Sequence, residues 1–208
     1  MIITDEYRRQ NKLLHEQNPV YGVSGRKRAP QVLQFCAELG SNSVLDYGCG
    51  KGTLATSLPF PIAGYDPAVE GKGATPSPAD LVICSDVLEH IEPDCLTDVL
   101  RDLHRVTRRM GYFVAHMGQS AKCLPDGRNT HLIQKPATWW TAQLEPLFEI
   151  TNHWCFGQEA HYVVVPRPLA RKQLLQPLSA DARLERVRSN ITRFRSLPRL
   201  GLCPDNDM

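Results

Sequence analysis

The residues with the clearest chemical meaning form a glycine-rich turn near position 50. Gly48, Gly50 and Gly52 alternate with other residues and follow Asp46, so an acid stands at the head of three evenly spaced glycines. Glycine has no Cβ, so such a turn brings bare backbone close to a ligand, and unpaired N–H groups of a following helix can face the same ligand. The pattern predicts a site for a nucleotide-like cofactor.

The spacing of this turn excludes two common nucleotide sites. A triphosphate-binding loop ends in Gly-Lys followed by Ser or Thr, whereas Lys51 is followed by Gly52. A dinucleotide site needs a third glycine three positions after the second, and Thr53 stands there. We therefore expect a ligand that is neither a nucleoside triphosphate nor a dinucleotide.

Two further segments add chemistry to the turn. Asp66 follows Asp46 by twenty residues and ends a second predicted strand. A carboxylate at this distance can accept hydrogen bonds from both hydroxyls of a ribose. Residues 79–91 read ADLVICSDVLEHI, an apolar run followed by Ser85, Asp86 and the tetrapeptide VLEH.

In this order and spacing, the three motifs resemble the signatures of class I S-adenosylmethionine-dependent methyltransferases, and VLEH is similar to the ubiquinone-type, small-molecule subgroup. The resemblance covers about residues 21–165. It implies a methyltransferase with S-adenosylmethionine as its cofactor. The cofactor-binding residues that it implies are Asp46, Gly48, Cys49, Gly50, Asp66, Pro67, Ser85 and Asp86.

The resemblance also implies a role for each part of this set. The glycine turn is expected under the methionine part of the cofactor, and Asp66 on its ribose. Asp46 would accept hydrogen bonds from the turn amides or from the cofactor's ammonium group. Ser85 and Asp86 would lie beside the sulfonium, because ligands of open parallel sheets bind at the carboxyl ends of the strands. Glu89 and His90 are interpreted mainly as helix-start and packing residues.

The stretch after Asp66 departs from the family pattern. Only residues 67–80 separate it from the next predicted strand, and three of them are proline. A usual family member has a helix and a third strand here, and an acidic residue that approaches the adenine. We expect a shortened crossover, a sheet without one edge strand, and no assigned adenine contact.

Methyl transfer from a sulfonium is an in-line displacement, to which an enzyme contributes alignment and the removal of a proton. The candidate base is His131, which lies in a polar loop after the strand predicted at 112–116. Histidine titrates near neutral pH. Asn129 of the same loop is a candidate substrate-binding residue. The alternative is that Asn129 and His131 only tie the loop to backbone groups.

The segment before the first predicted helix is the other candidate wall of the pocket. Tyr21 could stack on the acceptor or the cofactor, or only pack against the helix. Arg26 and Lys27, with Arg28, could hold a phosphate. Tyr21, Arg26 and Lys27 are therefore predicted to bind the substrate.

These side chains must be positioned by alternating strands and helices, which predicts an α/β fold. We expect a Rossmann-like, mostly parallel sheet with a C-terminal antiparallel hairpin and one shortened crossover. The predicted helices are 29–39, a short one at 53–58, 94–109 and 136–144, and the predicted strands are 43–47, 62–66, 81–85, 112–116, 147–156 and 161–165. The expected divisions are an N-terminal cap segment at 1–28, a methyltransferase domain at 29–166 and a basic, partly helical C-terminal extension at 167–208.

Composition limits the partners. A length of 208 residues with 42% hydrophobic content suits one domain. No apolar run approaches a membrane span of about 18 to 20 residues. Seven cysteines without paired spacing favour a cytoplasmic, reducing location and predict neither a disulfide framework nor a metal site. Residues 1–30 carry six Lys or Arg and three Asp or Glu, and residues 166–208 carry nine and four.

Three functions remain open at this point. The first is methylation of a small molecule, phosphorylated or nucleotide-like, which the basic ends would attract. The second is methylation of a nucleic acid bound by the basic C-terminal extension. The third is a non-catalytic protein that binds S-adenosylmethionine. The sequence predicts no membrane partner and specifies no oligomeric state.

Overall fold

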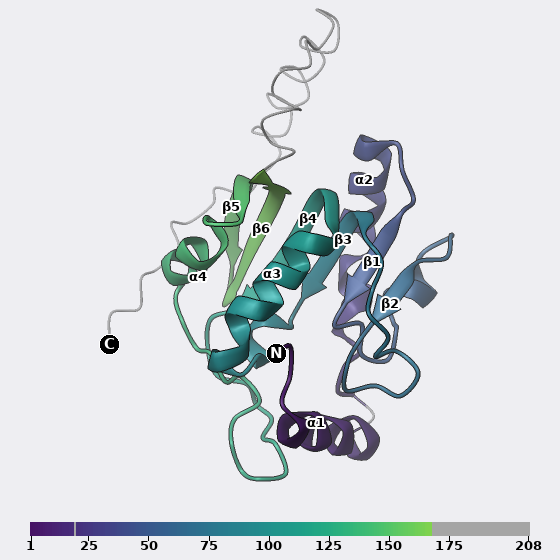
Figure 1. The fold of residues 1–208 in the computed structure, drawn as a ribbon. Helices are drawn as coiled ribbons and strands as arrows, with labels where there is room; N and C mark the ends of the chain where they lie inside the picture. The colour runs from purple at the N-terminus through teal and green to yellow at the C-terminus, as the bar shows by residue number, and fades with distance from the viewer. Residues whose placement is uncertain (19, 168–208) are drawn as a thin grey trace, which may run out of the picture.

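The computed structural model describes residues 1–18 and 20–167, which contain a six-stranded sheet of order β2-β1-β3-β4-β6-β5 (Figure 1). β1 to β4 are parallel, and β6 runs antiparallel to both β4 and β5. The predicted α/β sheet with an antiparallel C-terminal hairpin is therefore confirmed. The strands are β1 Val44–Tyr47, β2 Ala63–Tyr65, β3 Ala79–Ser85, β4 Thr107–His116, β5 Phe148–Phe156 and β6 Glu159–Pro166.

Helices cover both faces of the sheet, and α3 crosses its front in Figure 1. The α-helices are α1 Asp5–Gln17, α2 Ala29–Leu39, α3 Leu96–Val106 and α4 Ala137–Leu144, with short 3-10 turns η1 Ser24–Arg28, η2 Ala55–Ser57, η3 Leu88–His90 and η4 Pro93–Cys95. Within the described ranges, no helix has both the length and the apolar character that crossing a membrane requires. The predicted basic extension at 167–208 lies outside these ranges, apart from Arg167.

The central position of β3 in the sheet explains why its sequence is a continuous apolar run. Val82 and Cys84 pack in the cluster with α3 and α4, whereas Leu81 and Ile83 pack in the cluster with α2. All four side chains are fully buried. Both faces of this central parallel strand are covered by helices, so no position needs to be polar.

The predicted helix at 94–109 is wrong at its C-terminal end. α3 ends at Val106, and β4 begins at once with Thr107, which pairs with Ala79. The Thr107 hydroxyl donates a hydrogen bond to the Leu103 carbonyl at 2.7 Å, which satisfies one of the last helical acceptors. Helical spacing of charged residues misled the prediction, because Arg108 and Arg109 continue the pattern of the helix while their backbone is already extended.

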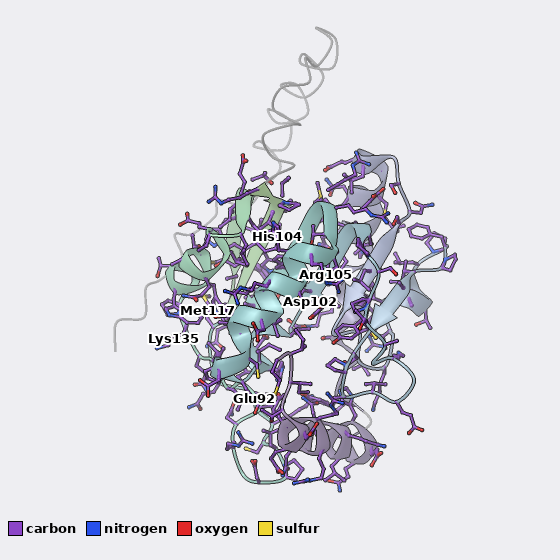
Figure 2. The ribbon with its side chains drawn as sticks, in the orientation of Figure 1. Glu92, Asp102, His104, Arg105, Met117 and Lys135 are labelled. Carbon is purple, nitrogen blue, oxygen red and sulfur yellow. The ribbon has the colours of Figure 1, made fainter. Side chains whose placement is uncertain are left out.

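The connection between β2 and β3 is shortened, as predicted. Residues 66–78 form turns rather than a helix and a strand, which leaves β2 at the edge of the sheet. α3 holds this connection: Arg105 donates to the Pro76 carbonyl at 3.2 Å while it pairs with Asp102 at 2.8 Å (Figure 2). The short helix predicted at 53–58 is reduced to the single turn η2.

α1 lies at the end of the sheet where the parallel strands finish (Figure 1). The Thr4 hydroxyl accepts a hydrogen bond from the Tyr7 amide and so caps the helix. Glu92, labelled in Figure 2, accepts hydrogen bonds from the Thr4 amide at 3.0 Å and the Thr4 hydroxyl at 2.8 Å. These bonds fix the start of α1 against the segment that precedes α3.

Candidate functional site

A cavity of about 480 Å³ opens at the carboxyl ends of β1 to β4 and is covered by α1 and η1. Its volume lies in the range of small-molecule sites. Nine of the residues predicted for the site line it: Tyr21, Arg26, Lys27, Gly48, Gly50, Asp66, Pro67, Asp86 and His131. Four do not: Asp46, Cys49, Ser85 and Asn129.

The glycine turn follows β1 and has the backbone that its sequence predicts. Gly48, Gly50 and Gly52 have φ of 78°, 48° and 75°, in the left-handed region that side chains disfavour. A Cβ on Gly50 would also lie 2.8 Å from the carbonyl oxygen of Gly22. The Lys51 amide donates to that same carbonyl at 3.0 Å. The turn therefore packs directly on the backbone of the N-terminal segment.

Asp66 connects the end of β2 to this turn. One carboxylate oxygen accepts a hydrogen bond from the Gly50 amide at 3.0 Å, and the other accepts from the Ala68 amide at 2.9 Å. The side chain is only 8% exposed, and its residue lines the cavity. Each carboxylate oxygen can accept more than one hydrogen bond. The held carboxylate thus retains acceptor capacity for a ligand's hydroxyls.

Asp46 lies deeper, below the turn. Among the described residues, no turn amide donates to its carboxylate; the Gly50 amide goes to Asp66 instead. Burial raises the pKa of Asp46 to about 7, the charge of Asp66 adds to the rise, and Lys72 opposes it. Asp46 was expected to accept hydrogen bonds from the turn amides or from the cofactor's ammonium group. The Gly50 amide of the turn donates to Asp66 instead.

Asp86 follows β3 and has φ of 57°. Positive φ is uncommon for residues other than glycine, and such strained positions cluster at functional sites. The guanidinium of Arg28 contacts Asp86 at 3.4 Å and Glu159 at 3.0 Å, and its Nε donates to the Ser85 hydroxyl at 2.9 Å. Arg28 is therefore a buried tie between η1, β3 and β6. The prediction that it holds a phosphate with its neighbours is wrong, because its charge is already paired within the fold.

Arg26 and Lys27 remain at the cavity with exposed side chains. Lys27 lies 3.7 Å from Glu159, in a pair whose lysine is more than half exposed. Such pairs are weak and readily exchanged. These two cations can therefore still meet an anionic ligand, unlike Arg28.

Three imidazoles gather at the cavity, which His90, His116 and His131 all line. The His131 ring lies 4.8 Å from the His90 ring and 4.8 Å from the His116 ring, between centroids. Nδ1 of His90 lies 2.7 Å from the Thr130 carbonyl, and Nδ1 of His131 lies 2.7 Å from the Gly118 carbonyl. Burial lowers the pKa of both histidines, that of His90 to about 3. Both rings are therefore neutral at pH 7.

Glu89 is the fully buried member of the same region. Burial raises the pKa of its carboxyl well above the usual range, and the charge of Asp86 raises it further, while the amides of Glu89 and His116 oppose the shift. Neither oxygen makes a hydrogen bond of ordinary geometry among the described residues. The prediction of a mainly packing role for Glu89 does not account for a fully buried carboxyl beside the cavity.

Asn129 braces the loop that carries His131. Its side-chain oxygen accepts from the amides of Ser120 at 3.1 Å and His131 at 2.9 Å, and its Nδ2 donates to the Ser120 carbonyl at 2.8 Å. Asn129 does not line the cavity. The alternative role, in which it ties the loop to backbone groups, fits this placement better than substrate contact.

Tyr21 is 8% exposed and lies between several side chains of the cavity wall. Its ring is 4.7 Å from that of His15 and 6.0 Å from that of His90, and the Lys122 ammonium lies 5.4 Å from its centroid. Tyr21 packs in the wall and also lines the cavity, and its contact with the acceptor or the cofactor stays a prediction.

Sequence reasoning missed several lining residues. Tyr7, Asn11 and His15 of α1 lie on the cavity side, and so do His116 and Lys122. The four-residue spacing from Tyr7 to Asn11 to His15 marks one face of a helix and was a usable signal. His116 is the last residue of β4, where side chains meet the ligand edge of a parallel sheet. No pattern in the neighbouring sequence identifies Lys122 as a residue that lines the cavity.

Comparison with solved structures shows the same fold at low sequence identity. The chain matches the Burkholderia thailandensis 1,6-didemethyltoxoflavin-N1-methyltransferase, crystallised with 1,6-didemethyltoxoflavin and S-adenosylhomocysteine, with a TM-score of 0.54 and 14% identity over 76% of this chain and 86% of that one. It matches the DhpI–S-adenosylhomocysteine complex with a TM-score of 0.50 and 16% identity, over 77% and 93% of the two chains. It matches a Clostridium acetobutylicum S-adenosylmethionine-dependent methyltransferase with a TM-score of 0.50 and 14% identity, over 75% of this chain and 98% of that one.

Sequence comparison assigns the family. None of the curated proteins matches the chain. The model of a family described as a methyltransferase domain matches residues 21–161, which is more than half of the chain. The narrower resemblance to the ubiquinone-type subgroup stays a prediction. The chain therefore belongs to this methyltransferase-domain family.

Proposed function

We propose that this protein transfers a methyl group from S-adenosylmethionine to a small-molecule acceptor. One observation carries the proposal: one cavity is lined by the glycine turn with Asp66, here called the cofactor side, and by His90, His116 and His131, here called the acceptor side. The first side suits the cofactor and the second suits an acceptor that must lose a proton. The bound ligands of the first structural neighbour, S-adenosylhomocysteine and a small acceptor, support this division.

The residues of the first side fit the cofactor chemically. The glycine turn offers close backbone to the methionine part, with Gly48 and Gly50 at the cavity. Asp66 would accept hydrogen bonds from the ribose hydroxyls, Pro67 would line the same end, and Asp46 would attract the ammonium group from below. Ser85, tied to Arg28, would support Asp86 near the sulfonium. When bound, the cofactor supplies an electrophilic methyl group.

His131 would remove the proton of the acceptor. A carbonyl can only accept a hydrogen bond, so Nδ1 of His131 must carry the hydrogen that points to Gly118. This leaves the lone pair on Nε2 of a ring that lines the cavity. The lowered pKa keeps the ring neutral and ready to accept a proton at pH 7. Asn129 would act as a positioning residue through the His131 amide.

The acceptor would be a compact molecule with an anionic part. Residues 1–28 would act as a cap segment, with α1 covering the cavity and Tyr21 forming part of its wall. Arg26 and Lys27, exposed at the cavity, would meet a phosphate or another anion. A long polymer would have to enter beneath α1, which disfavours a nucleic-acid acceptor. The basic residues on which that alternative depends lie almost entirely outside the described ranges.

Transfer of a labelled methyl group tests the proposal. The full chain would be incubated with methyl-labelled S-adenosylmethionine and a cell extract separated into small-molecule, nucleic-acid and protein pools. We expect label in the small-molecule pool, lost with His131→Asn and kept with His153→Asn, a control on the exposed part of β5. Label in the nucleic-acid pool would support the second function. Tight cofactor binding with no label in any pool would support a non-catalytic binding protein and contradict the proposal.

A further inference from the structure

Glu89, His90 and His131 form a cluster whose chemistry goes beyond proton removal. Each side chain offers one ligand atom, and these three atoms lie within 4.8 Å of one another. Glu89 and His90 belong to η3, whereas His131 comes from the loop after β4. All three residues line the cavity. Two segments that are far apart in the chain thus bring two nitrogens and one carboxylate together at one point.

The hydrogen bonds of the two imidazoles orient them as metal ligands. Each ring uses Nδ1 to donate to a backbone carbonyl, of Thr130 or of Gly118, at 2.7 Å. The other nitrogen, Nε2, therefore keeps its lone pair in both rings. Histidines that bind metal ions almost always donate their second N–H to a carbonyl or carboxylate in this way, because that bond fixes the tautomer and the ring.

The carboxyl of Glu89 is the second, independent observation. Its side chain is fully buried and neither oxygen has a hydrogen bond of ordinary geometry among the described residues. A buried polar group without a partner costs about 1 to 3 kcal/mol. Such a cost is offset when the group binds a ligand. A divalent cation is such a ligand, because it would displace the proton of this carboxyl and bind it beside two neutral imidazoles.

We propose that Glu89, His90 and His131 bind one divalent transition-metal ion in the cavity. Two imidazoles and one carboxylate suit Zn²⁺, Co²⁺, Mn²⁺ or Fe²⁺ rather than Ca²⁺ or Mg²⁺, which prefer sites made of oxygen ligands. Metal–ligand distances of about 2.0 to 2.2 Å require the three atoms to approach one another by about 1 Å. The absence of a metal site, expected from the cysteines alone, is revised, since none of these ligands is a cysteine.

Three protein ligands leave coordination positions for another molecule. If the proposed methyl transfer is correct, the ligand at these positions would be an acceptor hydroxyl. The ion would lower the pKa of that hydroxyl. With the ion bound, the lone pair of His131 would serve as a ligand, so the proton would pass to His116 or to water instead of to His131. The acceptor oxygen then forms a bond to the methyl carbon, the sulfur–carbon bond breaks, and its electron pair stays on sulfur.

Cobalt binding tests the site without depending on activity. The full chain, without a histidine tag and stripped with a chelator, would be titrated with Co²⁺ while visible ligand-field absorption is recorded. We expect saturation at one ion per chain, displacement by Zn²⁺, and no displacement by Mg²⁺. Glu89→Gln and His131→Asn should each weaken Co²⁺ binding by about 100-fold, since loss of a direct ligand exceeds the 10- to 100-fold effect of outer groups. His153→Asn should bind as the parent does.

Two results would overturn the site. One is the absence of ligand-field absorption at cobalt concentrations up to about 1 mM. The other is unchanged affinity in His131→Asn, which remains decisive if Glu89→Gln fails to fold, as circular dichroism would reveal. Calorimetry with S-adenosylmethionine separates this inference from the proposed function. If the protein binds the cofactor and transfers methyl groups but does not bind cobalt, only the proposed metal site is contradicted. If it binds cobalt but transfers no methyl group, only the proposed function is contradicted.

Discussion

The two sides of the cavity are built in different ways. The cofactor side consists of backbone: three glycines with positive φ, the amides of Gly50 and Ala68, and one aspartate that accepts from both. The acceptor side consists of side chains, with His90, His116 and His131 facing one another and Glu89 buried beside them. The first side comes from the segments that directly follow β1 and β2, and the second comes from η3, the end of β4 and a loop.

This difference separates features that many methyltransferase sequences can share from features that change from one protein to the next. A backbone cradle depends on glycine positions and a register, so many sequences can share it while they bind the same cofactor. An arrangement of side chains depends on which residues happen to lie at the ends of several strands, so it changes from one protein to the next. Mutations on one side should therefore leave the other side working.

The largest effect is expected from His131→Asn on the acceptor side. Loss of a general base typically lowers the rate by about 10² to 10⁴-fold. Because His131 does not touch the glycine turn, affinity for S-adenosylmethionine should stay within about twofold of the parent, well under the tenfold that 1.4 kcal/mol represents. Single-turnover methyl transfer and calorimetry measure the two quantities. A parallel loss of cofactor affinity would show that the two sides are coupled.

The next effect is expected from Gly50→Ala on the cofactor side. The new Cβ would lie 2.8 Å from the Gly22 carbonyl oxygen, and φ is 48°. We expect cofactor affinity to fall by about 100-fold, since backbone strain and a displaced amide add to about 3 kcal/mol.

Gly157→Ala is the matched control for Gly50→Ala. Gly157 has φ of 58°, but a Cβ added there would meet no atom within 4 Å, and the residue lies in the β5–β6 turn away from the cavity. This variant should lose some stability to the positive φ and keep its cofactor affinity. If both variants bind the cofactor equally well, the close approach of the glycine turn to the N-terminal segment has no functional role.

The sequence predicts the fold and the cofactor side of the cavity better than it predicts the acceptor side. Apolar runs and helical spacing locate β1 to β4, α2, α4 and the hairpin, because these patterns reflect burial on one or two faces. The glycine turn and Asp66 are recognisable because their function requires a fixed local spacing. The predicted C-terminal end of α3 is wrong, because the residues after Val106 keep a helical charge pattern while they pair with β3.

Of the residues Glu89, His90, His116 and His131 on the acceptor side, only His131 was predicted to have a functional role. Glu89 and His90 look like ordinary residues of a helix start, and their meaning arises when the loop after β4 folds back over η3. The Ile133 amide, for example, donates to the Glu89 carbonyl at 3.0 Å across 44 positions of the chain. Such contacts depend on tertiary folding, so no spacing rule finds them. The same holds for Arg28, whose phosphate role could be rejected only after its buried partners were known.

A smaller effect is expected from Arg28→Met, which removes the buried tie between η1, β3 and β6. Arg28 is 6% exposed and contacts both Asp86 and Glu159. Removing one member of a buried charge group leaves its partners unpaired, and we expect the free energy of unfolding to fall by about 2 to 3 kcal/mol, below the full range for deep sites because Glu159 is partly exposed. Urea unfolding measures this change. Lys27→Met, which removes an exposed partner of the same Glu159, should change stability by less than about 1 kcal/mol.

The smallest effect concerns pH on the cofactor side. Because burial raises the pKa of Asp46 to about 7, its carboxyl is largely protonated at pH 6 and largely ionised at pH 7.5. The ionised form attracts the cofactor's ammonium group, so affinity should rise about tenfold over this range, in proportion to the ionised fraction. Calorimetry at several pH values measures it, and Asp46→Asn should remove the dependence.

The same shift predicts the opposite trend for stability. Over about pH 4 to 7 the folded protein holds a proton on Asp46 that the unfolded chain has released, so this group makes folding less favourable as the pH rises through that window. Stability that falls while cofactor affinity rises is the signature of a buried carboxyl kept for binding. If both quantities were independent of pH in the parent protein, Asp46 would be a structural acid, and the cofactor side would consist of the glycine turn and Asp66 alone.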